Sequence, residues 1–212
     1  MQYFLEHFGI SVAAITGVLA ARGKQVDLFG VLVLALVTAM GGGTIRDVLL
    51  GTLPVFWASD PSCIYNAAIT AVITFYLVRY RELPANVLMV SDAFALALFT
   101  MIGTRKAVMV HSVPVISILM GVTTGVGGGL LRDLLIGELP LVFRKEIYLY
   151  ATAAFGGALA FVTLNQFSIF AQWNGILSTL VTLLLRLAGI RWKIALPMFR
   201  PKSTSSRPGN NL

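Results

Sequence analysis

A fourteen-residue segment with unusual chemistry occurs twice in the chain. Each copy reads Gly-Gly-Gly-x-x-Arg-Asp-x-Leu-x-Gly-x-x-Pro, at residues 41–54 and 127–140, and the copies lie 86 residues apart with 9 of 14 positions identical. Backbone carbonyls that glycines free from a helix can coordinate cations, and the N-terminus of the following half-helix favours anions. The segment therefore predicts a site that binds or conducts charged solutes.

The composition excludes several classes of protein. The chain is 57% hydrophobic and only 12% charged, whereas a soluble domain carries about 25% charged residues. Long apolar runs indicate an integral membrane protein, and basic loops explain the net charge of +7 without nucleic acid as a partner. The sequence holds no phosphate-binding loop, zinc-protease pattern or nucleophile elbow. We expect neither an enzyme nor a resident cofactor.

Seven apolar stretches predict seven transmembrane helices in an all-α membrane protein. Each is close to the ~20 residues that a helix needs to cross ~30 Å of hydrocarbon. They cover residues 6–21, 28–50, 62–79, 86–104, 113–136, 146–164 and 172–190. The loops are short, so any site must lie among the helices. The polar tail, residues 203–212, has the composition of a disordered segment.

The distribution of Lys and Arg predicts the orientation in the membrane. If the N-terminus is outside, eleven basic residues of the loops and tail are cytoplasmic, and only Arg105 and Lys106 are external. Because basic loops remain in the cytoplasm, we expect the N-terminus outside and the C-terminus inside.

The 86-residue offset spans three predicted helices, and three crossings reverse the direction of the chain. Residues 1–85 are therefore expected to form one three-helix repeat and residues 86–170 a second, inverted one. Residues 171–202 would hold a seventh, supporting helix and a basic segment. Inverted-repeat transporters place their site near the bilayer midplane, at the interface between the repeats.

The glycine triplets allow two interpretations. Three glycines in a helix interior, at about 1 kcal/mol each, favour a kink or an unwound turn, and broken backbone cannot face lipid. A pathway element is one interpretation, and close packing of helices through small residues is the other. The candidate residues for shaping the pathway are Gly41, Gly42, Gly43, Gly127, Gly128 and Gly129, together with Thr38 and Thr124 on the same helix faces.

Four charged residues follow the triplets by about one helical turn: Arg46, Asp47, Arg132 and Asp133. Exposed to lipid, they would together cost about 10 kcal/mol, so they must face protein or form ion pairs. Adjacent helical residues do not face each other. We therefore expect pairs across the repeats, Arg46 with Asp133 and Arg132 with Asp47. These residues either set the electrostatics of a pathway and gate it, or only clamp the repeats together.

Other polar residues are candidate partners or ligands. Glu6 and Asp92 occupy matching positions of the two repeats and are alternative partners for the arginines. Asp92, well inside a predicted helix, is either a cation or proton-coupling site or the partner of an arginine. Cys63 is the only cysteine, which excludes a multi-cysteine metal site. His7 and His111 have no ligand partner at a useful spacing, so we expect no metal site.

The doubled motif, in a seven-helix chain of this length, resembles the trimeric intracellular cation channel (TRIC) family, in particular its bacterial and archaeal members. The repeat of that family is also described as a glycine-transporter-type domain. The resemblance covers the first six predicted helices. The chain departs from the animal members, because it lacks their Lys-Glu-Val pore motif and its C-terminal tail is short.

The resemblance implies a homotrimer in the plasma membrane of a prokaryote, surrounded by lipid, with a pore in each subunit. The pore would be lined by the first, second, fourth and fifth helices, with the second and fifth kinked at the glycines. The implied activity is conduction of monovalent cations, chiefly K⁺, with K⁺ or Na⁺ bound in passage. A secondary transporter for a small solute such as glycine is the alternative, because inverted repeats also serve alternating access.

Overall fold

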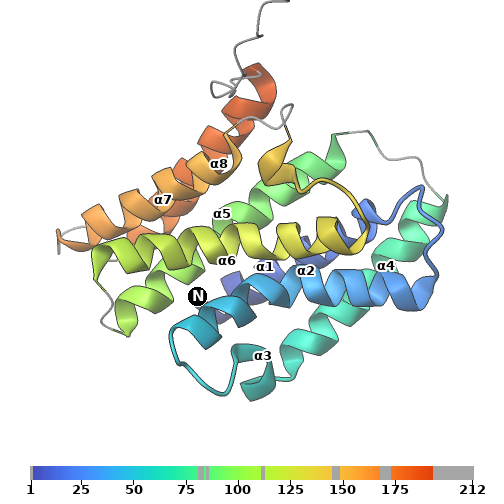
Figure 1. Ribbon diagram of the computed structural model, residues 1–212, viewed down its shortest axis with the longest axis horizontal. Coiled ribbons are helices and arrows are strands. Elements are labelled where there is room, and N and C mark those ends of the chain that lie inside the picture. Colours follow the sequence, from blue (N-terminus) through green and yellow to red (C-terminus); the bar gives the residue numbers. More distant parts are fainter. Residues whose placement is uncertain are drawn as a thin grey trace, which may run out of the picture.

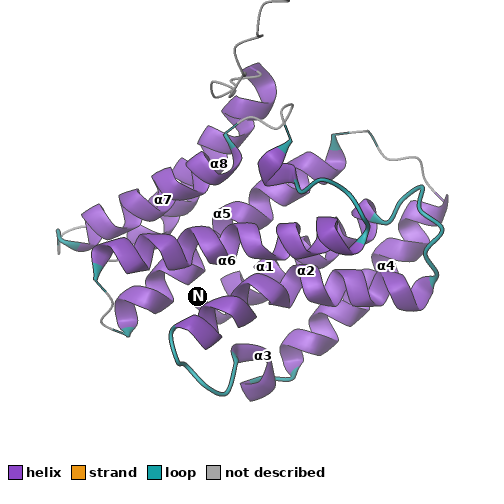
Figure 2. Ribbon diagram, viewed as in Figure 1, coloured by secondary structure: helices purple, strands orange, loops and turns teal. Residues whose placement is uncertain are grey.

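The computed structural model describes residues 2–80, 84, 86–110, 113–144, 149–167 and 173–192. Within these ranges every regular element is helical, and no strand is present (Figures 1 and 2). The elements are α1 (Gln2–Ala20), α2 (Leu28–Leu49), α3 (Phe56–Ser59), α4 (Ser62–Tyr80), α5 (Val87–Met109), α6 (Pro114–Leu135), η1 (Leu141–Phe143), α7 (Tyr150–Asn165) and α8 (Asn174–Trp192). The expected all-α fold is confirmed.

Six helices are long and apolar enough to cross a membrane, and α7, with 16 residues, is a shorter apolar helix. All seven coincide with the predicted spans to within a few residues. The largest difference is α5, which extends to Met109 and therefore includes Arg105 and Lys106, the two residues that were expected in an external loop. The predicted disordered tail, residues 203–212, lies outside the described residues.

The two predicted repeats correspond to α1, α2 and α4 and to α5, α6 and α7. Within the first repeat α1 packs against α2 and α4, and within the second α5 packs against α6 and α7. The two groups meet where α2 lies beside α6 and α1 beside α5 (Figure 1). The described part of α8 covers α5 and α7, so the seventh helix belongs to the second half of the molecule.

Small residues allow the helices to approach closely. Ala35, Ala67, Ala154 and Ala158 are fully buried, and a Cβ added at Gly17 would lie 2.7 Å from the Cα of Ala35. Lipid provides no hydrophobic force between helices, so close backbone packing of this kind must hold them together. Many large apolar side chains are exposed instead, as expected of a surface in contact with lipid.

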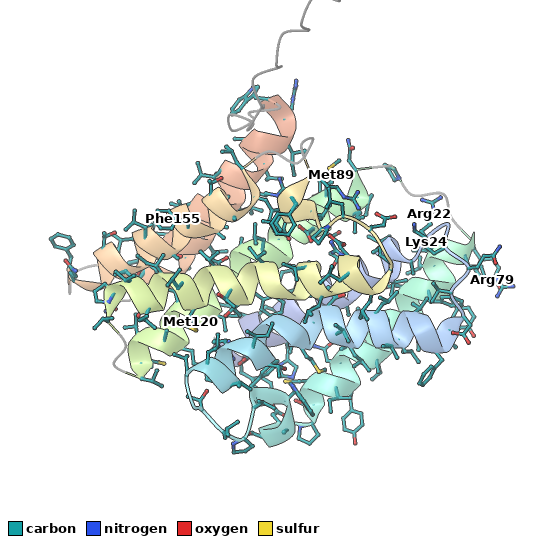
Figure 3. All side chains as sticks on the ribbon, in the orientation of Figure 1. Arg22, Lys24, Arg79, Met89, Met120 and Phe155 are labelled. Carbon is teal, nitrogen blue, oxygen red and sulfur yellow. The ribbon has the colours of Figure 1, made fainter. Side chains whose placement is uncertain are left out.

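Basic side chains gather at one end of the first repeat. Arg22, Lys24 and Arg79 lie together beyond the end of α1 (Figure 3) and line a cavity of about 290 Å³. The first residues of α1 and α4 lie at the opposite end. This distribution is the one that basic cytoplasmic loops produce.

Candidate functional site

The glycine triplets lie where α2 and α6 cross. A Cβ added at Gly42 would clash with the carbonyl oxygen of Thr124. A Cβ added at Gly128 would clash in the same way with the carbonyl oxygen of Thr38. The contacts are reciprocal across the 86-residue offset. As the residue number rises along α2 it falls along α6, so the two helices run antiparallel. The repeats are thus related by a local two-fold arrangement at this crossing.

Both helices continue without interruption through their triplets. The expectation of an unwound turn is therefore wrong, while a bend of the helix axis stays a prediction. The reason lies in the packing: without side chains, the glycines let the two helix backbones touch, and this contact offsets the low helix propensity of glycine. The close-packing interpretation describes this structure.

Thr38 and Thr124 use their hydroxyls within their own helices. Each donates at 2.5 Å to the carbonyl four residues earlier, that of Leu34 and that of Met120. Both residues are buried. Because helical threonine commonly forms this bond, the bond itself indicates no ligand, and a pore-lining role for the two threonines stays a prediction.

The first charged cluster is built around the Asp47 carboxylate. Arg46 Nε and Nη2 both lie 2.8 Å from Asp47 Oδ1, and Lys106 Nζ of α5 lies 2.7 Å from the same oxygen. The other oxygen, Oδ2, accepts a hydrogen bond of 2.9 Å from the Phe56 amide. Arg46 also lies over the Phe56 ring, 5.7 Å from its centroid. This cluster joins α2, α3 and α5.

The second charged cluster repeats this plan with different partners. Arg132 Nε lies 2.8 Å from Asp133 Oδ1, and Arg132 Nη1 lies 3.0 Å from Asp92 Oδ1 of α5. Asp133 Oδ2 accepts a hydrogen bond of 2.8 Å from the Leu141 amide. In both copies the aspartate therefore ties the end of its helix to the loop that follows.

Tyr150 of α7 and Arg186 of α8 complete the second cluster. The Arg186 guanidinium lies over the Tyr150 ring, 4.8 Å from its centroid, and both residues are buried. Asp92 interacts with both side chains. Two arginines and two aspartates thus lie in one enclosed group, and their charges balance.

The pairing expected from the sequence is partly wrong. Each arginine bonds the adjacent aspartate rather than the aspartate of the other repeat. The Cβ atoms of adjacent helical residues point in different directions, which was the reason to exclude this pairing. The arginine side chain is long enough to turn back, and its Nε reaches the neighbouring carboxylate. The alternative partner Asp92 is confirmed for Arg132. Among the described residues, no ion pair joins Glu6 to an arginine.

The last glycine of the motif ends each helix. Gly51 and Gly137 adopt positive φ angles of 68° and 70°, which glycine tolerates and which close a helix C-terminus. The next amides, of Thr52 and Glu138, each donate at 2.9 Å to the carbonyl of the motif aspartate. The four residues from the motif aspartate to this glycine therefore place the glycine where it can cap the C-terminus of the helix.

Sequence reasoning missed three residues of the clusters. Lys106 was assigned to a loop, Tyr150 fell at the start of a predicted span, and Arg186 lay in a helix expected only to support the others. A basic residue inside the apolar run 174–192 was the available signal, because a charge within a membrane span requires a partner.

His7, for which the sequence offered no ligand partner at a useful spacing, lies beside polar side chains of another helix in the structure. His7 Nε2 lies 2.9 Å from Ser62 Oγ, and a ligand atom of His7 lies within 4.8 Å of one from Asp60 and one from Cys63. His7 is far in the sequence from Asp60 and Cys63, which are three residues apart, so no local spacing indicated that the three lie together.

Antiparallel repeats that meet at tightly packed helices, with balanced charges buried beside them, define a class of inverted-repeat membrane transport proteins. Comparison with known proteins places the chain within this class. The sequence profile described as "Glycine transporter" matches twice, over residues 3–79 and 89–166. The two matches start 86 residues apart, the same offset that separates the motif copies.

Curated relatives cover nearly the whole chain. The UPF0126 inner membrane protein YadS of Escherichia coli is 47% identical over 201 residues, 94% of this chain and 96% of the relative. A UPF0126 membrane protein of Vibrio cholerae is 45% identical over 203 residues, 94% of this chain and 83% of the relative.

Solved structures are also similar to this chain over nearly its whole length. The TRIC channel orthologue from Rhodobacter sphaeroides superimposes with a TM-score of 0.85 at 39% identity, over 91% of this chain and 98% of that one. Another TRIC cation channel gives 0.85 at 32% identity, over 95% and 98%. The chain belongs to the family that the glycine-transporter profile describes, and it is similar over nearly its whole length to both the UPF0126 membrane proteins and the TRIC channels. The expectation of a non-enzyme is confirmed.

Proposed function

We propose that the chain is a channel for monovalent cations with a preference for K⁺, and that it assembles as a homotrimer with one pore in each subunit. The observation that carries the proposal is the similarity to the TRIC channel orthologue, at a TM-score of 0.85 and 39% identity over 91% of the chain. Identity at this level, over nearly the full length of both chains, extends beyond a shared fold. No resident cofactor is required.

The proposed pore is bordered by α1, α2, α5 and α6. Each helix of this bundle contacts the other three, which supports the proposal that all four border one path. Both motif copies and the acids Asp47 and Asp92 belong to this bundle. Buried carboxylates beside a path favour cations, and the neighbouring basic groups moderate that attraction.

In the proposed channel, the crossing of α2 and α6 closes the path in this conformation. The backbones touch at Gly42 and Gly128, so an ion must pass beside the crossing or the helices must separate. In the proposed channel, the glycines allow the two helices to slide or part without the collision of side chains, and the adjoining Arg-Asp pairs hold the helix ends while they do so.

The proposed location is the inner membrane of a bacterium, as the name of the Escherichia coli relative states for that protein. The N-terminus is placed outside, with Arg22, Lys24 and Arg79 at the cytoplasmic end. A cysteine-labelling experiment tests this orientation. A cysteine replaces Gln2 in a Cys63→Ser background, and a membrane-impermeant, cysteine-reactive label is added. Labelling in intact spheroplasts supports it, and labelling only after lysis contradicts it.

Single-channel recording of the purified full-length chain in planar bilayers tests the activity. The expected result is unitary K⁺ current, with a reversal potential under K⁺/Na⁺ gradients that shows K⁺ to be preferred. A change of unitary conductance in the variant Lys106→Met assigns the current to this chain rather than to a contaminant. Saturable glycine uptake by proteoliposomes without unitary current would instead support the transporter. Native mass spectrometry should show three subunits, and a monomer or dimer contradicts the trimer.

A further inference from the structure

A second group of polar side chains lies outside the charged clusters, where the first turns of α1 and α4 meet. His7 belongs to α1, Asp60 lies two residues before α4, and Cys63 lies in the first turn of α4. One imidazole nitrogen, one carboxylate oxygen and the Cys63 Sγ all lie within 4.8 Å of one another. Cys63 is buried, and the other two residues are half-buried. The charged clusters and the proposed pore do not account for this group.

The His7 ring is held in the orientation of a metal ligand. Its Nδ1 lies 3.2 Å from the carbonyl oxygen of Tyr3, which can only accept a hydrogen bond. Nδ1 is therefore the donor in this contact, and Nε2 is the nitrogen that faces Ser62 Oγ at the start of α4. A ligating histidine usually donates its other N–H to a carbonyl or carboxylate in this way.

Asp60 is oriented by the start of α4. Its Oδ1 accepts hydrogen bonds from the Ser62 amide at 3.0 Å and from the Ser62 hydroxyl at 2.5 Å. The same hydroxyl lies 2.9 Å from His7 Nε2. Ser62 Oγ thus bridges His7 and Asp60 and lies between two of the three ligand atoms. A bound ion would take over this bridging position.

We propose that His7, Asp60 and Cys63 form a binding site for Zn²⁺ or a chemically similar divalent transition metal. Imidazole, thiolate and carboxylate together are the ligands of zinc, and three protein ligands leave a fourth position for water. Bond lengths of about 2.0–2.3 Å place tetrahedral ligands roughly 3.5 Å apart, so the group closes by about 1 Å on binding. The thiol proton is released to solvent when the metal binds.

The site belongs to the first repeat alone. The matching positions of His7 and Cys63 in the second repeat hold Ala93 and Leu149, which cannot ligate a metal. A metal at this site would join α1 to the turn between α3 and α4. The Phe56 amide in α3 bonds Asp47, so the metal would act on the neighbourhood of the first charged cluster.

Titration of the full-length, untagged protein with Co²⁺ tests the proposal without relying on conduction. Because Cys63 is the only cysteine, a thiolate-to-cobalt charge-transfer band in the wild-type protein by itself assigns the ligand. We expect one Co²⁺ per chain, displaced by Zn²⁺ but not by Ca²⁺, which prefers oxygen ligands. His7→Ala, Asp60→Asn and Cys63→Ser should each weaken Zn²⁺ binding at least about tenfold.

His111→Ala is the matched control, since it removes the only other histidine. It should leave both the cobalt band and the Zn²⁺ affinity unchanged. Absence of the band in wild-type protein, equal displacement by Ca²⁺, or an equal loss in the His111→Ala variant overturns the proposal. A melting temperature of each variant equal to that of the wild type, measured without metal, shows that lost binding is not lost folding.

Discussion

The two charged clusters follow one plan but differ in their contact with solvent. In the first, Asp47 pairs with Lys106, whose side chain is 31% exposed. In the second, Arg132 pairs with Asp92, and these side chains are 0% and 4% exposed. The first cluster therefore has an edge at the surface of the chain, whereas the second is enclosed within it.

The charges explain this difference. Arg46, Lys106 and Asp47 sum to one excess positive charge, whereas the second cluster has two arginines and two aspartates. An excess charge is costly to enclose, and a balanced group with good hydrogen bonds is less so. The second cluster thus joins α5, α6, α7 and α8 through an enclosed, neutral group. The first cluster keeps an excess positive charge at its exposed edge.

Helix α8 accounts for much of the difference between the two clusters. Arg186 is fully buried and comes from α8, which has no counterpart in the first repeat. The helix that was expected only to support the others therefore contributes a charge to the second cluster. Its presence also explains why the second cluster needs Asp92, a buried acid in the second turn of α5, to balance two arginines.

The largest expected effect comes from breaking the enclosed cluster. Asp92→Asn leaves Arg132 without its α5 partner in a site enclosed within the chain. Breaking one half of a buried pair costs about 3–5 kcal/mol. We expect a marked loss of melting temperature in detergent and of folded yield, both measured by fluorescence-detected size exclusion.

Glu6→Gln is the matched control for this change, because Glu6 occupies the corresponding position of the first repeat. No ion pair of Glu6 is found among the described residues, so its melting temperature should stay close to that of the wild type. Equal losses for the two variants would show that the clusters do not differ as described.

Adding a methyl group at the helix crossing should have the next largest effect. In Gly42→Ala and Gly128→Ala the new Cβ meets a carbonyl oxygen of the other helix. Overpacking of this kind costs about 1–3 kcal/mol, and it forces α2 and α6 apart. We expect a lower melting temperature together with a changed open probability in bilayers.

The control for the crossing is Gly175→Ala, whose Cβ would lie no closer than 3.4 Å to the flexible Met101 side chain. It should alter neither property. If Gly42→Ala and Gly128→Ala both keep wild-type stability and currents, the crossing has no role in holding or opening the bundle.

Removal of the exposed charge should affect conduction more than stability. Lys106→Met abolishes the excess charge of the first cluster, and a partly exposed pair contributes less than about 1 kcal/mol. A unit charge about 8 Å from an ion in water shifts its energy by about 0.5 kcal/mol. We expect a roughly twofold rise in unitary K⁺ conductance at low salt, which disappears at high salt. Arg105→Gln, which removes the neighbouring charge, should produce a smaller change.

The helices could be predicted from the sequence because each span is one uninterrupted apolar run, and the two-fold relation could be predicted because the motif recurs. The short helix α3 was missed since four residues carry no periodic signal. The sequence left the triplets open between a helix break and close packing because glycine propensity is local, while the contact of Gly42 with Thr124 depends on how two distant helices pack.

The partners of the buried charges could be predicted only in part. The sequence shows that Arg132 needs an acid, and the repeat register pointed to Asp92 among others. It does not show that Arg186 turns inward, because a helix with one arginine can also place that side chain at the membrane surface. Nor does it bring His7 to Cys63, since that contact arises from the packing of α1 against α4.

The smallest expected effect lies at the surface, where the repeats differ again: Glu138 of the second repeat replaces Thr52 of the first. Glu138 forms ion pairs with Lys24 and Arg144. The hydrogen bond from Lys24, followed by that from Arg144, holds the pKa of the Glu138 carboxyl below its ordinary value of 4.5. Because the pKa is lower in the folded state, the contribution to stability is complete above pH ~4.5 and is lost as the pH falls through the folded value. We expect Glu138→Gln to lower the melting temperature slightly at pH 7, and the difference from wild type to vanish in acid. A difference that persists in acid would mean that the glutamate acts by packing and not by charge.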